Sequence, residues 1–340
     1  MKKNNSLIPV VLLSALLLGI ILLTGMLFFG KRSAPTAAPA SETASLTEEE
    51  TSQPEETVLP AEASAAESSS AAAEQVQLSA PEREPDASAS AEETTGIGPV
   101  SGGVPASPNA SADDPYPGLY AESAEFTDDN TQKILYLTFD DGPSDNTDRL
   151  LSILADHGVK ATFFVSGQYG TAEERAERYR KILEAGHTIG LHTYSHDYEK
   201  IYASMDAYLS DMNKINEEVY AATGYQANLI RFPGGSASTH SGSLSGDLAA
   251  EMTRRGYTYH DWAVSCGDAE GKNLSADEIA SETEAACLAR VKSVILFHDT
   301  PSQDTTVEAL DRIINDLEAE GYEFRALDNT IRPFQFTKLS

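Results

Sequence analysis

Basic residues are scarce in this chain. Of its 340 residues, 24 are lysine or arginine and 53 are aspartate or glutamate, so the formal net charge is −29. The acidic excess is present both in residues 33–112 and in the rest of the chain. Such a charge disfavours nucleic acid and other anionic polymers as partners. We therefore expect no nucleic-acid partner, and a substrate that is neutral or that yields a cationic product.

Cysteine is also rare, with only Cys266 and Cys287 in the whole chain. The apolar N-terminal region contains none, which excludes a bacterial lipid anchor on cysteine. The two thiols could pair in an oxidising compartment outside the cell. Cys287 also falls about two helical turns after Ile279, on the same face of a predicted helix. A buried free thiol is therefore the alternative.

Aromatic residues are absent from residues 33–112, which consist mainly of Ala, Ser, Glu, Thr and Pro. A segment of this composition buries too little apolar surface to offset the entropy that it would lose on ordering. We predict a disordered acidic tether over residues 33–113. A ligand-binding tail is the alternative explanation of the same composition.

Residues 7–29 form one uncharged apolar run, which follows Lys2 and Lys3. A membrane span needs about 20 such residues, whereas the apolar part of a cleaved signal peptide has roughly 7–15. We predict an uncleaved transmembrane signal-anchor over residues 1–32, with cleavage as the alternative. Because the following composition is typical of secreted proteins, we expect a single-pass protein of the cell membrane with the part that follows the span outside the cell. Cleavage would make it a secreted protein.

From about Lys133 onward, short apolar runs alternate with helical patterns. The runs that predict strands are residues 134–139, 160–165, 187–192, 229–232, 257–262, 293–298 and 322–327. Two of the helices have clear start signals, because Thr171 with Glu174 and Ser275 with Glu278 match the capping box. This alternation indicates parallel strands covered by helices. We predict an α/β fold over residues 114–340, an irregular (β/α) barrel of about seven parallel strands. An open doubly wound sheet is the alternative.

Charged and aromatic residues follow the predicted strands at the ends where both folds place their active sites. They are Asp140, Asp141, His192, His196, Arg231, Asp261, Trp262, Asp268, His298 and Asp299. Each of them has an ordinary structural explanation when taken alone. Their gathering at one rim of the predicted sheet indicates a functional site.

His192 and His196 stand four residues apart, a spacing that places both on one face of a helical turn. Alone this is a weak metal signal. Two histidines with one carboxylate and an open position can bind a metal that acidifies water. Of the adjacent Asp140 and Asp141, one could complete such a set while the other remains free as a base. A polar turn that caps a helix is the alternative explanation of the pair.

Five stretches of the chain resemble, in order, the motifs of the polysaccharide deacetylase family, which is also called the NodB-homology domain or carbohydrate esterase family 4. They are TFDDGPS (138–144), HTYSH (192–196), RFPGG (231–235), DWAVSCGD (261–268) and LFH (296–298). The resemblance covers most of the predicted globular part. With the anchor and tether, the chain is similar to membrane-anchored enzymes that deacetylate N-acetylglucosamine in peptidoglycan.

The resemblance implies a divalent metal, Zn²⁺ in the first place, with Co²⁺, Mn²⁺ or Ni²⁺ as alternatives. Asp141, His192 and His196 would hold it. Asp140 would be the general base that takes a proton from water. Arg231 would orient Asp140, and a cation beside that carboxylate would keep it ionised.

The resemblance also implies that His298 is the general acid and that Asp268 orients it. Histidine suits this task because its unperturbed pKa is about 6.5. The backbone N–H of Gly234 would stabilise the developing oxyanion. Trp262 and Leu296 would enclose the acetyl methyl group, although as isolated residues both would be assigned to the core.

The implied activity is hydrolysis of a linear amide. An N-acetyl group would leave an acetylated glycan as acetate, and a free amine would remain on the sugar. We therefore expect an acetylated glycan as the substrate. We also expect the enzyme to be a monomer. The alternatives are a chitin-oligosaccharide deacetylase, an O-acetyl esterase on the same fold, and a glycan-binding module without catalysis.

The chain departs from the family pattern at two places. The third motif continues as RFPGGSASTHSG, a loop rich in Gly and Ser, where many members carry an aromatic residue. Ala263 stands in the fourth motif where Asn is common. His240, within the altered loop, is a candidate for contact with substrate. The motifs therefore predict the chemistry and leave the glycan undetermined.

Overall fold

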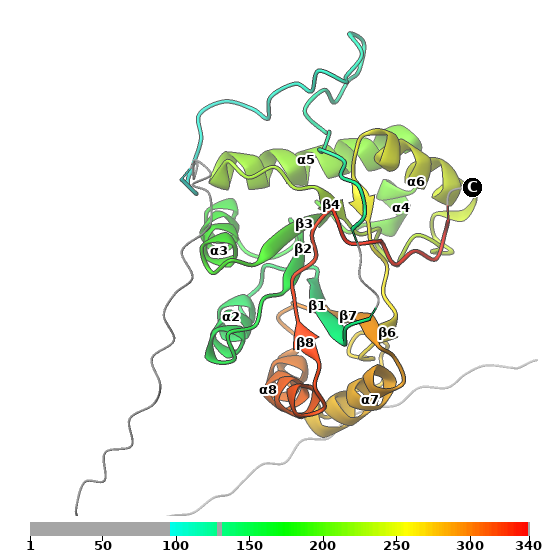
Figure 1. The fold of residues 1–340 in the computed structure, drawn as a ribbon. Coiled ribbons are helices and arrows are strands. Elements are labelled where there is room, and N and C mark those ends of the chain that lie inside the picture. The colour runs from blue at the N-terminus through cyan, green and yellow to red at the C-terminus, as the bar shows by residue number, and fades with distance from the viewer. Residues whose placement is uncertain (1–95, 128–130, 339–340) are drawn as a thin grey trace, which may run out of the picture. The chain divides into compact units, whose positions relative to one another are not determined.

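The computed structural model describes residues 96–127 and 131–338 (Figure 1). The predicted signal-anchor and most of the predicted tether lie outside the described residues. Within the described ranges, no helix combines the length and the apolar character needed to cross a membrane. The fold is therefore that of the domain that contains the five motifs.

One parallel sheet of eight strands forms the centre of this domain. The strands are β1 (Ile134–Asp140), β2 (Thr162–Ser166), β3 (Thr188–Thr193), β4 (Leu229–Ile230), β5 (Thr258–Tyr259), β6 (Val264–Ser265), β7 (Lys292–His298) and β8 (Glu323–Phe324). Their order is β5-β4-β3-β2-β1-β7-β6, and β8 pairs with the beginning of β1. The α/β class and the parallel pairing predicted from the sequence are confirmed. The pairings of the described strands do not join β5 to β6, so the barrel is an open half-barrel.

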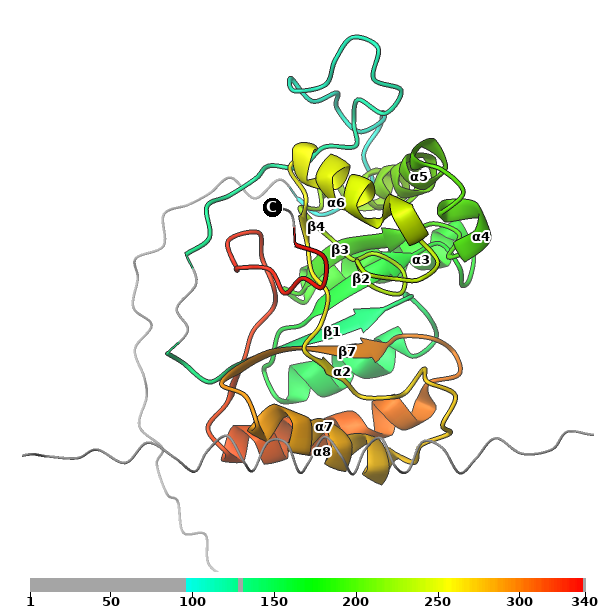
Figure 2. The same ribbon diagram turned by 90° about the vertical axis from the view of Figure 1, so that its right-hand side faces the viewer.

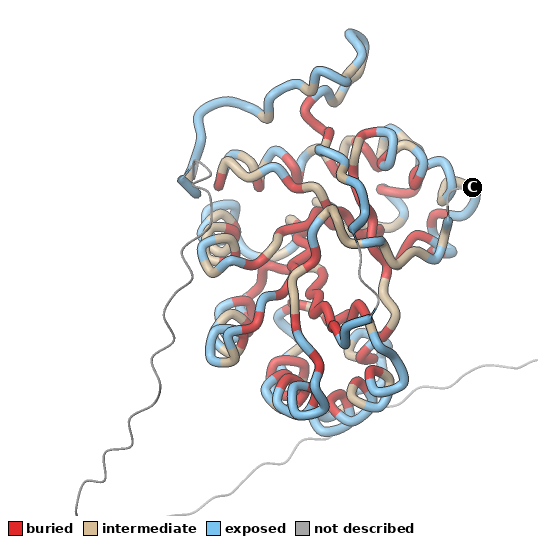
Figure 3. Tube along the Cα trace, in the orientation of Figure 1, coloured by how far each residue is buried: buried red, intermediate tan, exposed pale blue. Residues whose placement is uncertain are grey.

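Helices surround the sheet (Figures 1 and 2). They are α2 (Thr147–Asp156), α3 (Ala172–Glu184), α4 (Tyr198–Ile201), α5 (Met205–Thr223), α6 (Ser245–Arg254), α7 (Ala276–Leu288) and α8 (Asp304–Ala319), with a 3-10 turn at Gly242–Leu244. Both predicted capping boxes are present, at Thr171 for α3 and at Ser275 for α7. Figure 3 shows that the buried residues follow the strands and the helix faces turned toward them.

β1 is buried along its whole length, and its side chains alternate between two cores. Leu137 and Phe139 belong to the large core between the sheet and the helices. Tyr136 belongs to a smaller core on the opposite, inner face. Because successive side chains of a strand point to opposite faces, Thr138 and Asp140 lie on the inner face with Tyr136. The strand thus delivers a carboxylate to the inside of the half-barrel.

The chain that follows β8 fills this inner face. Leu327 is fully buried in the smaller core, and Ile331 and Phe334 pack against it. The same cluster contains Tyr136 and Phe164 from the strands. The C-terminal segment therefore covers the inner face of the half-barrel with apolar side chains.

Three predicted strands prove shorter, and one strand was not predicted. The runs 229–232, 257–262 and 322–327 contain only the two-residue strands β4, β5 and β8, and β6 was missed. The carbonyl groups of His260 and Asp261 accept hydrogen bonds from the Arg231 side chain, at 2.8 and 3.1 Å. The guanidinium group thus binds the two carbonyls that directly follow β5.

Residues near the C-terminal end of the predicted tether hydrogen bond to the domain. The Gly98 N–H donates to the Thr223 carbonyl at 3.2 Å, and the Val100 N–H donates to the Ala221 carbonyl at 3.1 Å. These bonds attach the segment to the last turn of α5. They join main-chain atoms, so side-chain composition does not predict them.

Cys266 and Cys287 are both free thiols, and both are buried. Burial raises the pKa of the Cys287 thiol to about 12. Of the two alternatives drawn from the sequence, the buried free thiol is the one observed.

Candidate active site

The carboxyl ends of the strands surround one hollow of about 430 Å³. Eight of the ten site residues predicted from the sequence line it: Asp140, Asp141, His192, His196, Gly234, Trp262, Leu296 and His298. The other two, Arg231 and Asp268, lie behind the wall and hydrogen bond to Asp140 and His298. Strands β1 and β7 are in register up to the pair Asp140 and His298, which brings these two side chains to the same rim.

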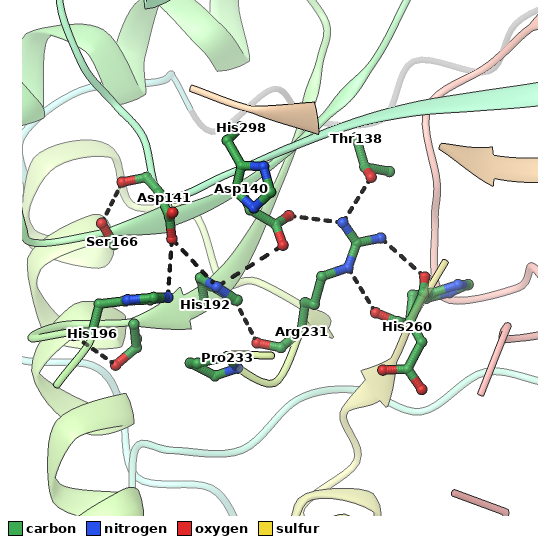
Figure 4. Close-up of polar contacts among 12 residues, drawn as sticks. Thr138, Asp140, Asp141, Ser166, His192, His196, Arg231, Pro233, His260 and His298 are labelled. Atoms are coloured by element: carbon green, nitrogen blue, oxygen red, sulfur yellow. Dashed lines mark hydrogen bonds and ion pairs between the residues drawn. The ribbon is translucent and has the colours of Figure 1, made fainter. Parts of the chain in front are cut away.

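Asp141, His192 and His196 point toward one another (Figure 4). The Asp141 Oδ1 atom lies 3.2 Å from His196 Nε2 and 3.5 Å from His192 Nε2. The three donor atoms lie within 4.8 Å of one another, which suits a shared cation. Asp141 Oδ1 is buried and has no hydrogen-bond partner among the described residues. A buried carboxylate oxygen without a hydrogen-bond donor is unfavourable, and a bound cation would provide the missing interaction.

The His192 ring is held in the tautomer that a metal ligand needs. Its Nδ1 atom lies 2.7 Å from the Arg231 carbonyl oxygen, which accepts a hydrogen bond from Nδ1–H. The Nε2 lone pair therefore faces Asp141. Burial lowers the pKa of His192 to about 3 despite the opposing charge of Asp141, so the ring is neutral at physiological pH.

Backbone conformation, and not strand alternation, brings Asp141 into the site. Asp141 has φ of +74° and His196 has φ of +50°, values that non-glycine residues rarely adopt. At Asp141 the chain leaves the extended geometry of β1, so its side chain does not continue to the opposite face. Such strained residues persist where the surrounding structure holds them.

Asp211 on α5 holds the turn that carries His196. Its carboxylate accepts hydrogen bonds from the N–H groups of Tyr194, at 2.6 Å, and Ser195, at 3.1 Å. The hydroxyl of Thr193 donates to the same carboxylate. Asp211 is buried and lies 15 residues after His196 in the sequence. No motif or spacing predicted this support.

Asp140 is paired with a completely buried arginine. The Arg231 Nη1 atom donates to Asp140 Oδ1 at 2.7 Å and to Thr138 Oγ1 at 2.7 Å. Burial raises the pKa of Asp140 above its ordinary value, and the charge and hydrogen bond of Arg231 only limit the rise. A raised pKa makes this carboxylate a better proton acceptor than an exposed aspartate.

His298 stands at the end of β7, next to Asp140 at the end of β1, and is oriented by Asp268. The ring Nδ1 atom of His298 lies 2.7 Å from Asp268 Oδ1. The backbone N–H of His298 donates to Asp268 Oδ2 at 2.9 Å. Thr306 on α8 also donates to Asp268, at 2.9 Å. Burial opposes protonation of His298, but Asp268, with smaller contributions from Asp140 and Asp141, raises its pKa to about 9. The ring is a cation at neutral pH and can give up a proton from Nε2.

The remaining predicted residues close the hollow. Gly234 has φ of +74°, and its N–H has no acceptor among the described residues. Trp262 and Leu296 contribute apolar surface to the same wall. A small acyl group placed here would contact an amide donor and two apolar side chains.

Some lining residues were not predicted, among them Tyr198 and Glu270. The Tyr198 ring on α4 lies 5.1 Å from the His196 ring and 4.4 Å from the His240 ring, measured between centroids. His240 was a candidate for substrate contact, and it reaches the site through Tyr198. Glu270 accepts a hydrogen bond from Ser265 at 3.0 Å and forms an ion pair with Lys272 at 2.7 Å. Only its position two residues after Asp268 could have suggested it.

Asp261 and Asp299, also at strand ends, hold loops in place. Asp261 accepts from the Ser236 N–H at 2.7 Å and from the Phe336 N–H at 2.6 Å. Asp299 accepts from the Ser144 hydroxyl at 2.7 Å, in the loop that follows the paired aspartates. Burial raises the pKa of Asp299 to about 6. Neither residue lines the hollow.

The region that contains these residues is similar to known proteins. The model of the polysaccharide deacetylase family matches residues 127–259, which contain Asp140, Asp141, both site histidines and Arg231. The putative polysaccharide deacetylase YheN of Bacillus subtilis is 33% identical over 224 residues, which cover 64% of this chain and 75% of the relative. The peptidoglycan-N-acetylmuramic acid deacetylase PdaA of Bacillus subtilis is 30% identical, over 58% of this chain and 71% of the relative.

A solved structure is similar over the same region. The catalytic domain of a peptidoglycan N-acetylglucosamine deacetylase from Eubacterium rectale superposes with a TM-score of 0.59 at 34% identity. The match covers 64% of this chain and 96% of that domain. The half-barrel described above is therefore a known architecture.

Proposed function

This chain belongs to the polysaccharide deacetylase family of hydrolases, and we propose that it removes the acetyl group from N-acetylglucosamine in peptidoglycan. The observation that carries the proposal is the presence in one hollow of a candidate base, a candidate acid and three metal-type ligands. The base is Asp140, supported by Arg231, and the acid is His298, supported by Asp268.

We propose that Asp141, His192 and His196 hold a divalent cation. The buried, unpartnered Oδ1 atom of Asp141 and the two Nε2 atoms that face it support this assignment. Imidazole nitrogens with one carboxylate suit Zn²⁺, and the open positions suit catalysis. A cation bound there would lower the pKa of a water molecule and polarise the acetyl carbonyl.

The other residues have separate tasks in the proposed reaction. Asp140 accepts the proton of the attacking water, and Arg231 holds its carboxylate in position. As charge develops on the acetyl oxygen, the N–H of Gly234 donates to it. His298 donates a proton from Nε2 to the sugar nitrogen as the C–N bond breaks. Acetate and a glucosamine amine are the products.

The charge of the hollow supports N-acetylglucosamine over N-acetylmuramic acid. Its described lining contains the carboxylates of Asp140, Asp141 and Glu270, and it contains no lysine or arginine. The proposed divalent cation and the protonated His298 would offset the charges of Asp140 and Asp141. Within the lining, Glu270, whose ion pair with Lys272 is exposed to solvent, is then the group that would repel the carboxylate of N-acetylmuramic acid. N-acetylglucosamine is neutral, and its deacetylated product is a cation that the same lining favours.

Acetate release distinguishes the candidate substrates. The purified domain, supplied with Zn²⁺, is incubated with an N-acetylglucosamine tetramer, with peptidoglycan fragments and with O-acetylated xylan. We expect acetate from the tetramer and from glucosamine positions of the fragments, with the loss of one acetyl mass per sugar in mass spectra. Acetate from xylan alone would identify an O-acetyl esterase, and no acetate from any substrate would favour a binding module.

We further propose that residues 7–29 anchor the enzyme in the cell membrane and that the tether lets the domain reach the cell wall. The uncharged apolar run and the acidic, aromatic-free segment after it support this proposal. Fractionation of cells that express the full chain tests it. Recovery of the intact chain from the membrane fraction, with the domain accessible to protease added outside, is expected. A shortened soluble form in the medium would indicate cleavage.

A further inference from the structure

Residues 336 and 337, near the C-terminus, are hydrogen bonded to the rim of the active site. The Phe336 N–H donates to Asp261 at 2.6 Å, and the Thr337 N–H donates to the Ser236 hydroxyl at 2.9 Å. The Thr337 hydroxyl donates in turn to the Ser236 carbonyl at 2.8 Å. These bonds hold the backbone of residues 336–337 against the loop that contains Gly234.

The side chain of Phe336 is presented at this rim without being buried. It is 49% exposed, and its ring centroid lies 5.1 Å from that of Trp262, with an angle of 81° between the ring planes. Trp262 lines the hollow. The edge-on contact sets the orientation of the Phe336 ring and leaves part of its surface open to solvent.

Phe336 occupies the space that a side chain on the third-motif loop would need. A Cβ atom at Gly235 would lie 3.2 Å from the Phe336 ring and 3.1 Å from the Trp262 ring. Gly235 also has φ of +83°, which disfavours any side chain there. Residues 234–242 contain no phenylalanine, tyrosine or tryptophan. At this edge of the hollow, the C-terminal segment therefore adds the ring of Phe336 to that of Trp262.

We infer that Phe336 binds a sugar ring of the glycan next to the one whose acetyl group is removed. The inference rests on the proposed function and adds a specificity-determining residue to it. A polymer that enters a hollow of about 430 Å³ must continue across the rim. The C–H face of a pyranose is apolar and neutral, and an exposed aromatic ring held by a fixed backbone offers it a flat apolar surface at little entropic cost.

Binding can be measured without turnover, because Trp262 is the only tryptophan of the chain and lies in the hollow. The chain is treated with a chelator and titrated with an N-acetylglucosamine tetramer while tryptophan fluorescence is recorded. We expect Phe336→Ala and Phe336→Leu to weaken binding of the tetramer about tenfold, the size of one lost aromatic stacking contact. Phe336→Tyr keeps a ring and retains wild-type affinity. The monosaccharide, which does not reach the rim, binds all forms equally.

Phe126→Ala is the matched control. Phe126 is 42% exposed, and its ring contacts Arg332, which is not among the residues of the hollow. This variant should bind the tetramer as the wild type does. With metal restored, Phe336→Ala should raise KM for the tetramer and leave kcat unchanged, because the ring does not touch the acetyl group.

The outcomes separate the two proposals. If the wild type binds and deacetylates the tetramer and Phe336→Ala has the same affinity, only the role of Phe336 is wrong. If the wild type neither binds the tetramer nor releases acetate from it, the proposed function fails, and the role of Phe336 fails with it. A weakened affinity in Phe336→Ala but not in Phe336→Leu would mean that apolar area matters and the ring does not, which also contradicts the inference.

Discussion

Arg231 and Asp140 form a buried ion pair, with Nη1 and Oδ1 2.7 Å apart and both side chains almost inaccessible to solvent. The guanidinium also binds Thr138 and the carbonyl groups of His260 and Asp261. One side chain thus positions the proposed base and ties β1 to the loop that follows β5.

Removal of this guanidinium should damage both stability and activity. Arg231→Met leaves the Asp140 carboxylate buried without its cation, a change that typically costs about 3–5 kcal/mol in the free energy of unfolding. Because Arg231 limits the rise in the pKa of Asp140, its loss should raise that pKa further and move the acidic limb of kcat/KM to higher pH. Urea unfolding and a pH profile of acetate release measure the two effects. Arg325→Met, at an exposed ion pair, should change neither.

The two adjacent aspartates should give different phenotypes. Asp141→Ala removes a proposed ligand and should abolish metal binding, measured by metal analysis after dialysis. Asp140→Asn keeps an acceptor for Arg231 and should retain the metal while it loses turnover. In the wild type, chelation should abolish acetate release, and Zn²⁺ or Co²⁺ should restore it. Equal metal content in the two variants would show that the assignment of ligand and base is wrong.

The pH dependence should show the role of Asp268. His298 has a pKa of about 9, so the proposed acid is protonated below that pH and its contribution is lost as the pH rises through it. Asp268→Asn removes the negative charge that holds this pKa up, so the alkaline limb of kcat/KM should move to lower pH. Histidine NMR resonances followed over the same pH range check the shift directly. His298→Ala should lower the rate without loss of the metal, and an unchanged alkaline limb in Asp268→Asn would refute the coupling.

Glu270 should affect the choice between the two peptidoglycan sugars. Glu270→Lys replaces a carboxylate of the lining with a cation, so a substrate that carries a carboxylate should bind better. We expect KM for N-acetylmuramic acid substrates to fall relative to KM for the N-acetylglucosamine tetramer. Glu323→Lys makes the same charge change at an exposed position of β8 that does not line the hollow, and serves as the control. An equal effect of both variants would show that net charge, and not the site, decides the preference.

The order of strands and helices was predictable because hydrophobic periodicity and capping boxes are local signals. The long strands β1, β2, β3 and β7 lie where the apolar runs predicted them. β4, β5 and β6 have two residues each, and so short a strand has no period of its own to detect. The length of such a strand depends on which groups hydrogen bond to its main chain in the folded protein. After β5, for example, the side chain of Arg231 binds two main-chain carbonyl groups.

Most of the candidate site was predictable for a different reason. Parallel strands end at one rim, so Asp140, His192, Arg231 and His298 had to gather once the strands were placed. Asp211, Tyr198 and Glu270 come from helices and loops whose directions no periodicity indicates. Phe336 is the extreme case, because it reaches the rim from the end of the chain.

The sequence by itself determined the parallel α/β class, the residues that meet at the carboxyl ends of the strands and the acidic character of the chain, because strand alternation, motif order and charge are properties of local sequence. Only the tertiary structure decided that Asp141 turns into the same hollow as Asp140, that both cysteines are buried free thiols, and that Phe336 lies beside Trp262. Each of these features depends on a backbone turn or on a contact between segments far apart in the chain. Such a contact stabilises the protein only when the rest of the fold holds both partners in place.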